Sequence, residues 1–198
     1  MHKICKGHSN SRFSSEAVLK PTGNWDGKDK NFKFKIRGRS DSNYATDPDN
    51  RRSITGTVVY LNDAPIAFSS VTQKHVTLSV TEAELAAVVT MVQDMMYVYR
   101  VMMSLGLEVE LPMLVEMDNS GARNLANSWS VGGRTRHVDV RMFFLRELKE
   151  DGLLSFKHVS GTENESDIFT KNVDAATLHK HAAKFCGEDN LYESLKKS

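Results

Sequence analysis

Four acidic residues stand out in the 198-residue sequence because each lies near the end of a patterned segment, where a carboxylate could take part in chemistry. They are Asp41, Glu84, Asp118 and Asp167. Converging carboxylates repel one another, so a site that gathers three or four of them is tolerable mainly when divalent cations neutralise it. Their hard oxygen atoms favour Mg²⁺, with Mn²⁺ as a substitute. We therefore expect these residues to be metal ligands and catalytic groups.

The chemistry that such a site can perform is phosphodiester hydrolysis. Two divalent ions roughly 3.5–4 Å apart can activate a water and stabilise the leaving oxygen in an in-line displacement. The protein then supplies the geometry and the ions supply the Lewis acidity. Spacing alone is a weak signal, because the chain has 25 Asp and Glu residues and most surface acids are simply solvated.

The segments before Glu84 show two patterns that are typical of β-strands. From Phe32 onward, apolar residues alternate with charged ones, which predicts a half-solvated strand that ends at Asp41. The β-branched stretch 54–61, the turn Asn62-Asp63 and the segment 65–70 predict an antiparallel hairpin. Three strands are therefore expected to come first.

A long helix should follow, because Ser79 and Glu82 have the spacing of a capping box. Its methionine-rich face is expected in the interior, and Leu105-Gly106 provides a glycine C-cap. The methionines are Met91, Met95, Met96, Met102 and Met103. Glu82 competes with Glu84 as the second acid, but two residues span about 200° of helix, so both cannot face one site. We favour Glu84, because capping gives Glu82 another role.

The remaining elements place the third and fourth acids. Residues 113–117 predict a short buried strand that delivers Asp118 at its end, with Asn119 and Ser120 opening a second helix. A helix over 135–149, a strand over 153–159 and helical segments from about Ser166 complete the chain. The expected fold is an α/β mixed sheet with helices.

Five segments of the chain resemble, in order, the signature blocks of copia-type ribonuclease H domains. They are SDSNYATDPDNRRSITG (40–56), APIAFSSVTQKHVTLSVTEAELAA (64–87), MDNSGARNLA (117–126), RTRHVDVRMFFLRE (134–147) and SDIFTK (166–171). The blocks cover most of the chain from about residue 36 to 172, and five blocks in order are far more specific than any one of them.

The resemblance implies a ribonuclease H-like fold, with a five-stranded mixed sheet of three antiparallel strands followed by parallel strands. It also implies a domain that follows a reverse transcriptase domain in a polyprotein and removes RNA from RNA:DNA hybrids. Matched to the motif, the family's four acids fall on Asp41, Glu84, Asp118 and Asp167. We expect a flexible tail over 1–30, the domain over 31–172 and a helical extension over 173–198.

The chain departs from the family at a few positions. Tyr44 stands where many relatives have Trp, and Val80 where they have Ser. The loop histidine that precedes the fourth acid in cellular and retroviral ribonucleases H is matched here by Thr162. His158 is nearby, but we expect it to have a structural role in partly buried packing. Catalysis that is slow, or that relies on metal ions alone, would follow.

Binding of nucleic acid must depend on local patches, because the formal net charge is only +1. The candidate phosphate contacts are Arg51, Arg52, Arg134 and Arg136. Selectivity for a hybrid should come from minor-groove contacts that sense the 2′-hydroxyl. The candidates for these contacts are Asn43, Asn119 and Ser120.

The composition also bears on location and on the alternative function. With Cys5 and Cys186 as its only cysteines and no sustained apolar run, the chain predicts neither a disulfide framework nor a membrane span. We expect an intracellular location in a cytoplasmic retroelement particle, with nuclear access left open. The alternative is a catalytically inactive remnant that acts as a nucleic-acid-binding or interaction module.

Overall fold

The computed structural model describes residues 33–118 and 136–186. In chain order the elements are β1 (Ile36–Asn43), β2 (Ile54–Leu61), β3 (Ala64–Thr72), α2 (Val80–Ser104), β4 (Met113–Met117), α4 (Arg136–Glu150), β5 (Leu154–His158), the 3-10 helices η1 (Gly161–Glu163) and η2 (Glu165–Phe169), and α5 (Ala175–Cys186). The expected tail over 1–30 and the helix expected to open at Asn119 lie outside the described residues. The helix expected near 135–149 is α4.

The five strands form one sheet in the order β3-β2-β1-β4-β5. Strands β1, β2 and β3 pair antiparallel, whereas β4 pairs parallel to both β1 and β5. This is the expected mixed sheet of three antiparallel strands followed by parallel ones, so the predicted fold is confirmed. The parallel pairings need crossover connections, and α2 provides the one between the hairpin and β4.

The hairpin turn follows directly from its residue types. Asn62 and Asp63 both have positive φ, 49° and 67°, as a two-residue turn of the primed type requires. Asn and Asp tolerate this left-handed conformation better than other non-glycine residues. The turn sets the register in which Leu61 faces Ala64.

Helix α2 begins and ends as its caps predict. The Ser79 hydroxyl accepts a hydrogen bond from the Glu82 amide, and the Glu82 carboxylate accepts one from the Leu78 amide. Gly106, with φ of 73°, follows the last turn. Four of the five methionines expected inside are buried, but Met103, in the last turn of α2, is 51% exposed, so the prediction is wrong for that residue.

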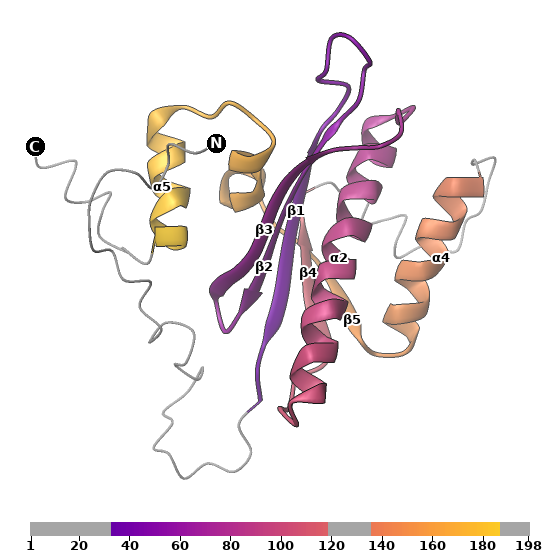
Figure 1. Cartoon of the computed structure of the whole chain (residues 1–198), viewed down its shortest axis with the longest axis vertical. Helices are drawn as coiled ribbons and strands as arrows, with labels where there is room; N and C mark the ends of the chain where they lie inside the picture. Colours follow the sequence, from indigo (N-terminus) through magenta and orange to yellow (C-terminus); the bar gives the residue numbers. More distant parts are fainter. Residues whose placement is uncertain (1–32, 119–135, 187–198) are drawn as a thin grey trace, which may run out of the picture.

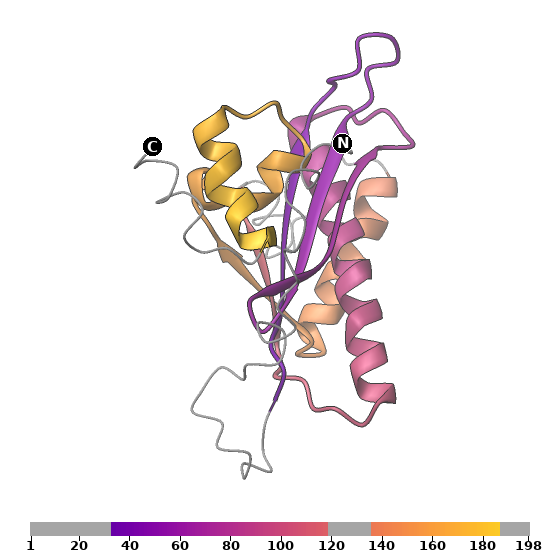
Figure 2. The same ribbon diagram turned by 60° about the vertical axis from the view of Figure 1, so that its left-hand side comes forward.

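The two faces of the sheet carry different layers (Figures 1 and 2). Helices α2 and α4 cover one face, and η2 and α5 lie on the other. The main core lies between α2 and the sheet. Helix α2 passes so close to β1 that a Cβ added at Gly38 would lie 1.9 Å from the Met91 sulfur. On the opposite face, a Cβ at Gly56 would be 2.7 Å from the Ser166 carbonyl oxygen.

Helix α5 is held to the second face by aromatic contacts. The Phe68 ring of β3 stacks on Phe169, and Phe185 of α5 meets both rings edge-on at centroid distances of 5.4–5.5 Å. The packing fixes η2 between the sheet and α5. Among the described residues, none of the helices combines the length and the apolar character needed to cross a membrane.

Candidate active site

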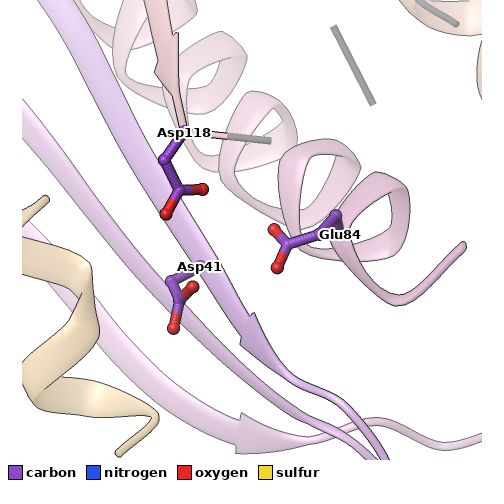
Figure 3. A group of neighbouring side chains, drawn as sticks. All are labelled: Asp41, Glu84 and Asp118. Carbon is purple, nitrogen blue, oxygen red and sulfur yellow. The ribbon is translucent and has the colours of Figure 1, made fainter. Parts of the chain in front are cut away.

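Three carboxylates from three different elements meet where β1 and β4 separate. The pairing between these strands stops at Arg39 and Glu116, so β1 continues beyond it from Ser40 to Asn43. Asp41 lies in this extension, Asp118 directly follows β4, and Glu84 projects from the first turns of α2. Figure 3 shows the three side chains pointing toward a common space. One ligand oxygen from each lies within 4.8 Å of the others.

Asp41 does not end its strand, contrary to the sequence-based expectation. Strand β1 runs on to Asn43, because Ser42 and Asn43 pair with Thr55 and Ile54 of β2. The alternation of apolar and charged residues stops earlier, but hydrogen bonding to the neighbouring strand does not. Asp41 is therefore held by pairing on β2 and is 2% exposed.

Glu84 is buried and strongly perturbed. Burial, together with the negative charges of Asp41 and Asp118, raises the pKa of Glu84 to about 8, although hydrogen bonds from Ser42 act in the opposite direction. The Ser42 hydroxyl donates to Glu84 Oε1 at 2.9 Å. Glu82, the competing residue, instead accepts from the Leu78 amide at the helix cap and is not among the three grouped carboxylates. The capping interpretation of Glu82 agrees with this geometry.

Asp41 is contacted by two residues that follow η2. Thr170 donates its hydroxyl hydrogen to Asp41 Oδ2, and the Lys171 ammonium group lies 3.2 Å from both carboxylate oxygens. Burial raises the pKa of Asp41, while Thr170 and Lys171 act to lower it. The Asp41 carboxylate is thus fixed in orientation by a hydroxyl group and an ammonium group.

Asp167 lies in η2 and is electrostatically coupled to Asp41 and Asp118, but it is not one of the three grouped carboxylates. Its Oδ1 atom is 3.2 Å from the Lys171 ammonium group. Burial raises the pKa of Asp167 to about 6, and the charges of Asp41 and Asp118 contribute to the same shift. The fourth predicted acid is therefore electrostatically coupled to the group and is joined to Asp41 by a lysine.

An ion-pair network under the site positions the segments that carry the acids. Arg39 pairs with Glu116 of β4 at 2.7 Å and with Glu165 of η2, which has no exposed surface. Arg39 also donates to the Glu163 carbonyl. Asn164 adds a hydrogen bond to the Ser40 carbonyl oxygen at 3.2 Å. These ion pairs and hydrogen bonds therefore connect β1, β4 and η2 next to the residues that carry the carboxylates.

The predicted nucleic-acid contacts are only partly described. The side-chain amide of Asn43 donates a hydrogen bond to the Thr170 carbonyl oxygen at 3.0 Å. This amide group therefore has a structural partner within the protein. Arg51 and Arg52 are exposed on the loop between β1 and β2. Asn119, Ser120 and Arg134 lie outside the described residues. Arg136 is the first residue of α4, and its side chain is not described.

The loop predicted to match the histidine-bearing loop of cellular and retroviral ribonucleases H lies close to the third acid. A Cβ at Gly161, the first residue of η1, would be 3.4 Å from Asp118 Oδ2, and Thr162 is the next residue. His158 ends β5 and is exposed. The expected role of His158 in partly buried packing is therefore wrong, because the residue ends the edge strand β5 and is exposed there.

Several residues that contact the acids escaped sequence reasoning. Ser42, Thr170 and Lys171 contact the carboxylates directly. Arg39 forms ion pairs with the two segments, β4 and η2, that precede or contain Asp118 and Asp167. One signal was present, because Lys171 follows Asp167 by four residues, the spacing at which opposite charges meet on a helical turn. The other contacts join segments far apart in the sequence, and no local pattern marks them.

The fold is that of the ribonuclease H class. LC11-RNase H1, isolated from compost by a metagenomic approach, matches with a TM-score of 0.52 and 17% identity, covering 69% of this chain and 92% of that one. The N-terminal RNase H domain of a Mycobacterium tuberculosis protein matches with a TM-score of 0.51 and 15% identity, covering 70% and 91%. At these identities the likeness establishes the fold.

The sequence relatives are Pol polyproteins of plant transposons. The retrovirus-related Pol polyprotein from transposon TNT 1-94 of Nicotiana tabacum is 35% identical over 138 residues, 70% of this chain. That from transposon RE1 of Arabidopsis thaliana is 31% identical over 149 residues, 75% of the chain. The chain spans about a tenth of the length of these relatives. No protein-family model matches. Relatives and fold together fit a retrotransposon ribonuclease H domain, which confirms the expected copia-type resemblance.

Proposed function

We propose that the chain is an endonuclease that hydrolyses the RNA strand of RNA:DNA hybrids with the help of two divalent metal ions. The observation that carries the proposal is the convergence of Asp41, Glu84 and Asp118 within 4.8 Å at the point where β1 and β4 separate. Their residue types and positions agree with the acids that the copia-type resemblance implies. The relatives, which are retrotransposon Pol polyproteins, make a hybrid substrate reasonable.

The residues present fit divalent cations. Glu84 and Asp41 are buried acids with raised pKa values, so the metal-free pocket gathers more negative charge than it readily holds. Carboxylate oxygens are the ligands that Mg²⁺ and Mn²⁺ prefer. Asp41, Glu84 and Asp118 would hold one ion, and Asp167 would join Asp41 at a second. When bound, such ions supply Lewis acidity toward the phosphodiester.

The surrounding side chains orient these ligands. Ser42 fixes one oxygen of Glu84, and Thr170 fixes one oxygen of Asp41. The ion pairs of Arg39 hold β4 and η2, the segments that carry Asp118 and Asp167, against β1. Such preorganisation matters because a carboxylate that is free to turn would place a cation less accurately.

The substrate and setting follow from the same proposal. Arg51 and Arg52 are exposed and free to contact phosphates, which would give binding with little sequence preference. The natural setting would be a polyprotein in which a reverse transcriptase domain precedes this one, working in an intracellular particle. Residues 31–172 would form the catalytic domain, with helix α5 in the extension that follows.

The direct test is cleavage of a labelled RNA:DNA hybrid by the purified chain. We expect cuts in the RNA strand that require Mg²⁺ or Mn²⁺ and are poorly supported by Ca²⁺, with DNA and RNA duplexes left intact. Asp118→Asn should abolish cleavage while hybrid binding persists. The matched control is Glu147→Gln, which removes an exposed acid of α4 and should cleave normally. Equal cleavage by Asp118→Asn would refute the proposed site.

The same experiment decides the alternative. Hybrid binding without cleavage under any divalent ion would identify an inactive module. The grouped carboxylates do not favour that outcome, because a remnant that only binds has no need to keep three repelling acids together.

A further inference from the structure

We propose that Lys171 is a built-in, displaceable cation of the acidic pocket, which competes with one of the two divalent ions. The ammonium nitrogen lies 3.2 Å from both oxygens of Asp41 and 3.2 Å from Asp167 Oδ1. It therefore bridges the two acids between which the second ion would bind. The proposal deepens the proposed function, because it concerns the occupancy of the same pocket.

The pocket has two ends that share Asp41. At one end, Asp41, Glu84 and Asp118 bring their oxygens within 4.8 Å of one another. At the other end, Asp167 lies outside that group and meets Asp41 through the lysine. Among the described ion pairs, none gives Glu84 or Asp118 a cationic partner. The two ends thus differ in the positive charge that the fold itself provides.

The charges explain why lysine and ion compete. When all four carboxylates are ionised, as cation binding requires, they and the ammonium group leave a formal charge of −3, which a single divalent ion reduces to −1. A second ion beside the lysine would make the pocket positive, whereas two ions without the lysine would leave it neutral. Like charges at contact distance are unfavourable even near a protein surface. The second ion therefore binds well only after the ammonium group leaves.

The lysine backbone is fixed, but its side chain can swing away. The Lys171 amide donates to the Asp167 carbonyl oxygen at 2.9 Å, and η2 is tied to the sheet by Ser70, which donates to the Phe169 carbonyl oxygen at 2.6 Å. The Lys171 side chain itself is 40% exposed. Because it borders solvent, the ammonium group can leave without any repacking of the core, and the cost of leaving is set by Asp41 and Asp167.

The consequence is unequal affinity for the two ions. The end with three carboxylates should fill first, and the end with Lys171 should fill only at higher ion concentration. Removing the lysine charge should tighten the second site. Keeping the charge in an arginine should preserve the difference between the sites.

The experiment counts Mn²⁺ ions bound to the purified chain without nucleic acid, by calorimetry and by the electron paramagnetic resonance signal of free Mn²⁺. Wild type should bind one ion more tightly than the second. In Lys171→Met, the dissociation constant of the second ion should fall on the order of tenfold. Lys171→Arg should resemble wild type, and so should the matched control Lys157→Met, which removes an exposed lysine of β5.

A second readout guards against a variant that fails to fold. Without metal, Lys171→Met should melt at a lower temperature than wild type, because Asp41 and Asp167 lose their shared cation, and saturating Mn²⁺ should close this gap. Lys171→Gln serves as a second uncharged variant with the same expectation. Identical Mn²⁺ isotherms for wild type, Lys171→Met and Lys171→Gln would overturn the inference, as would complete loss of ion binding in both variants.

The result is separable from the proposed function. Ion counting uses no hybrid, so unequal sites that become equal without the lysine would support the inference even if the chain cleaved nothing. Conversely, the chain could cleave hybrids while its Mn²⁺ affinities stay the same in the Lys171 variants. That result would support the proposed function and refute the role of Lys171.

Discussion

Arg39 and Glu165 form an ion pair across 126 residues of sequence, and the Glu165 side chain has no exposed surface. Each partner lies two residues before an acid of the pocket, Asp41 after Arg39 and Asp167 after Glu165. Glu116, the second carboxylate paired with Arg39, likewise lies two residues before Asp118. One guanidinium group thus sets the relative register of the three segments that carry these acids.

Replacement of Arg39 by methionine should therefore destabilise the protein. Glu116 and Glu165 are 8% and 0% exposed in their side chains. Glu116 would keep its ion pair with Arg37 at 3.2 Å, whereas Glu165 would lose the charge of Arg39 at a buried position. Breaking a buried pair by removing one partner typically costs about 3–5 kcal/mol. We expect Arg39→Met to lower the free energy of unfolding by about 3 kcal/mol, measured by urea denaturation.

The control for this prediction is a pair in solvent. Lys35 and Glu110 lie 3.6 Å apart with both side chains 52% exposed, and such pairs contribute less than about 1 kcal/mol. Lys35→Met should therefore unfold close to wild type. Similar losses in Arg39→Met and Lys35→Met would show that the buried network is not what holds η2.

The stability of the metal-free protein should fall as the pH rises. The folded state raises the pKa of Glu84 to about 8 from an ordinary value of 4.5, and that of Asp167 to about 6 from 3.8. A group with a raised folded pKa stabilises fully below its unfolded pKa, and this contribution disappears as the pH rises through the folded value. Between about pH 4.5 and 8, these groups should lower the free energy of unfolding by about 1 kcal/mol per pH unit.

Chemical denaturation at several pH values in a chelating buffer measures this slope. In Glu84→Gln the slope should be shallower, and the variant should be more stable than wild type near pH 8 without metal. Saturating Mg²⁺ should flatten the wild-type slope, because the ion favours the ionised carboxylates. A metal-free slope that Glu84→Gln leaves unchanged would mean that Glu84 ionises normally.

The two glutamates at the start of α2 should separate stability from activity. Glu82→Ala removes the hydrogen bond to the Leu78 amide, so it should cost about 1 kcal/mol of stability, as the loss of a helix cap does, and leave hybrid cleavage nearly intact. Glu84→Gln should lose cleavage and metal affinity. Cleavage assays and melting curves on both variants measure the two effects, and an inactive Glu82→Ala with an active Glu84→Gln would reverse the assignment.

A methyl group at Gly56 should disturb η2 selectively. The added Cβ would lie 2.7 Å from the Ser166 carbonyl oxygen and 2.7 Å from Thr170 Cγ2, so η2 must move away from β2. We expect Gly56→Ala to lower stability by about 1–3 kcal/mol, as overpacking does. Mn²⁺ binding at the end with three carboxylates should persist while the end with Asp167 weakens. Unchanged binding of both ions would show that η2 tolerates the shift.

Local patterns predicted much of the fold. The run 113–117 became β4, the Ser79 cap began α2, and the Asn62-Asp63 turn joined β2 and β3, because each depends on residues close together in the sequence. The sequence also predicted four acids as the site residues, although the residues alone gave a weak signal and the family resemblance gave it specificity. Of these acids, three meet within 4.8 Å and the fourth meets Asp41 through Lys171.

Tertiary structure decided the rest. The extension of β1 beyond Asp41 depends on hydrogen bonding to β2, and the separation of β1 from β4 creates the space in which acids from both faces of the sheet meet. The pairing of Arg39 with Glu165 and the position of Lys171 between two acids join segments more than 120 residues apart. The sequence determined which elements form and which residue types they carry, because those depend on local preferences. Only the packing of η2 on the sheet determined which charges meet, because contact distances across the chain depend on the whole fold.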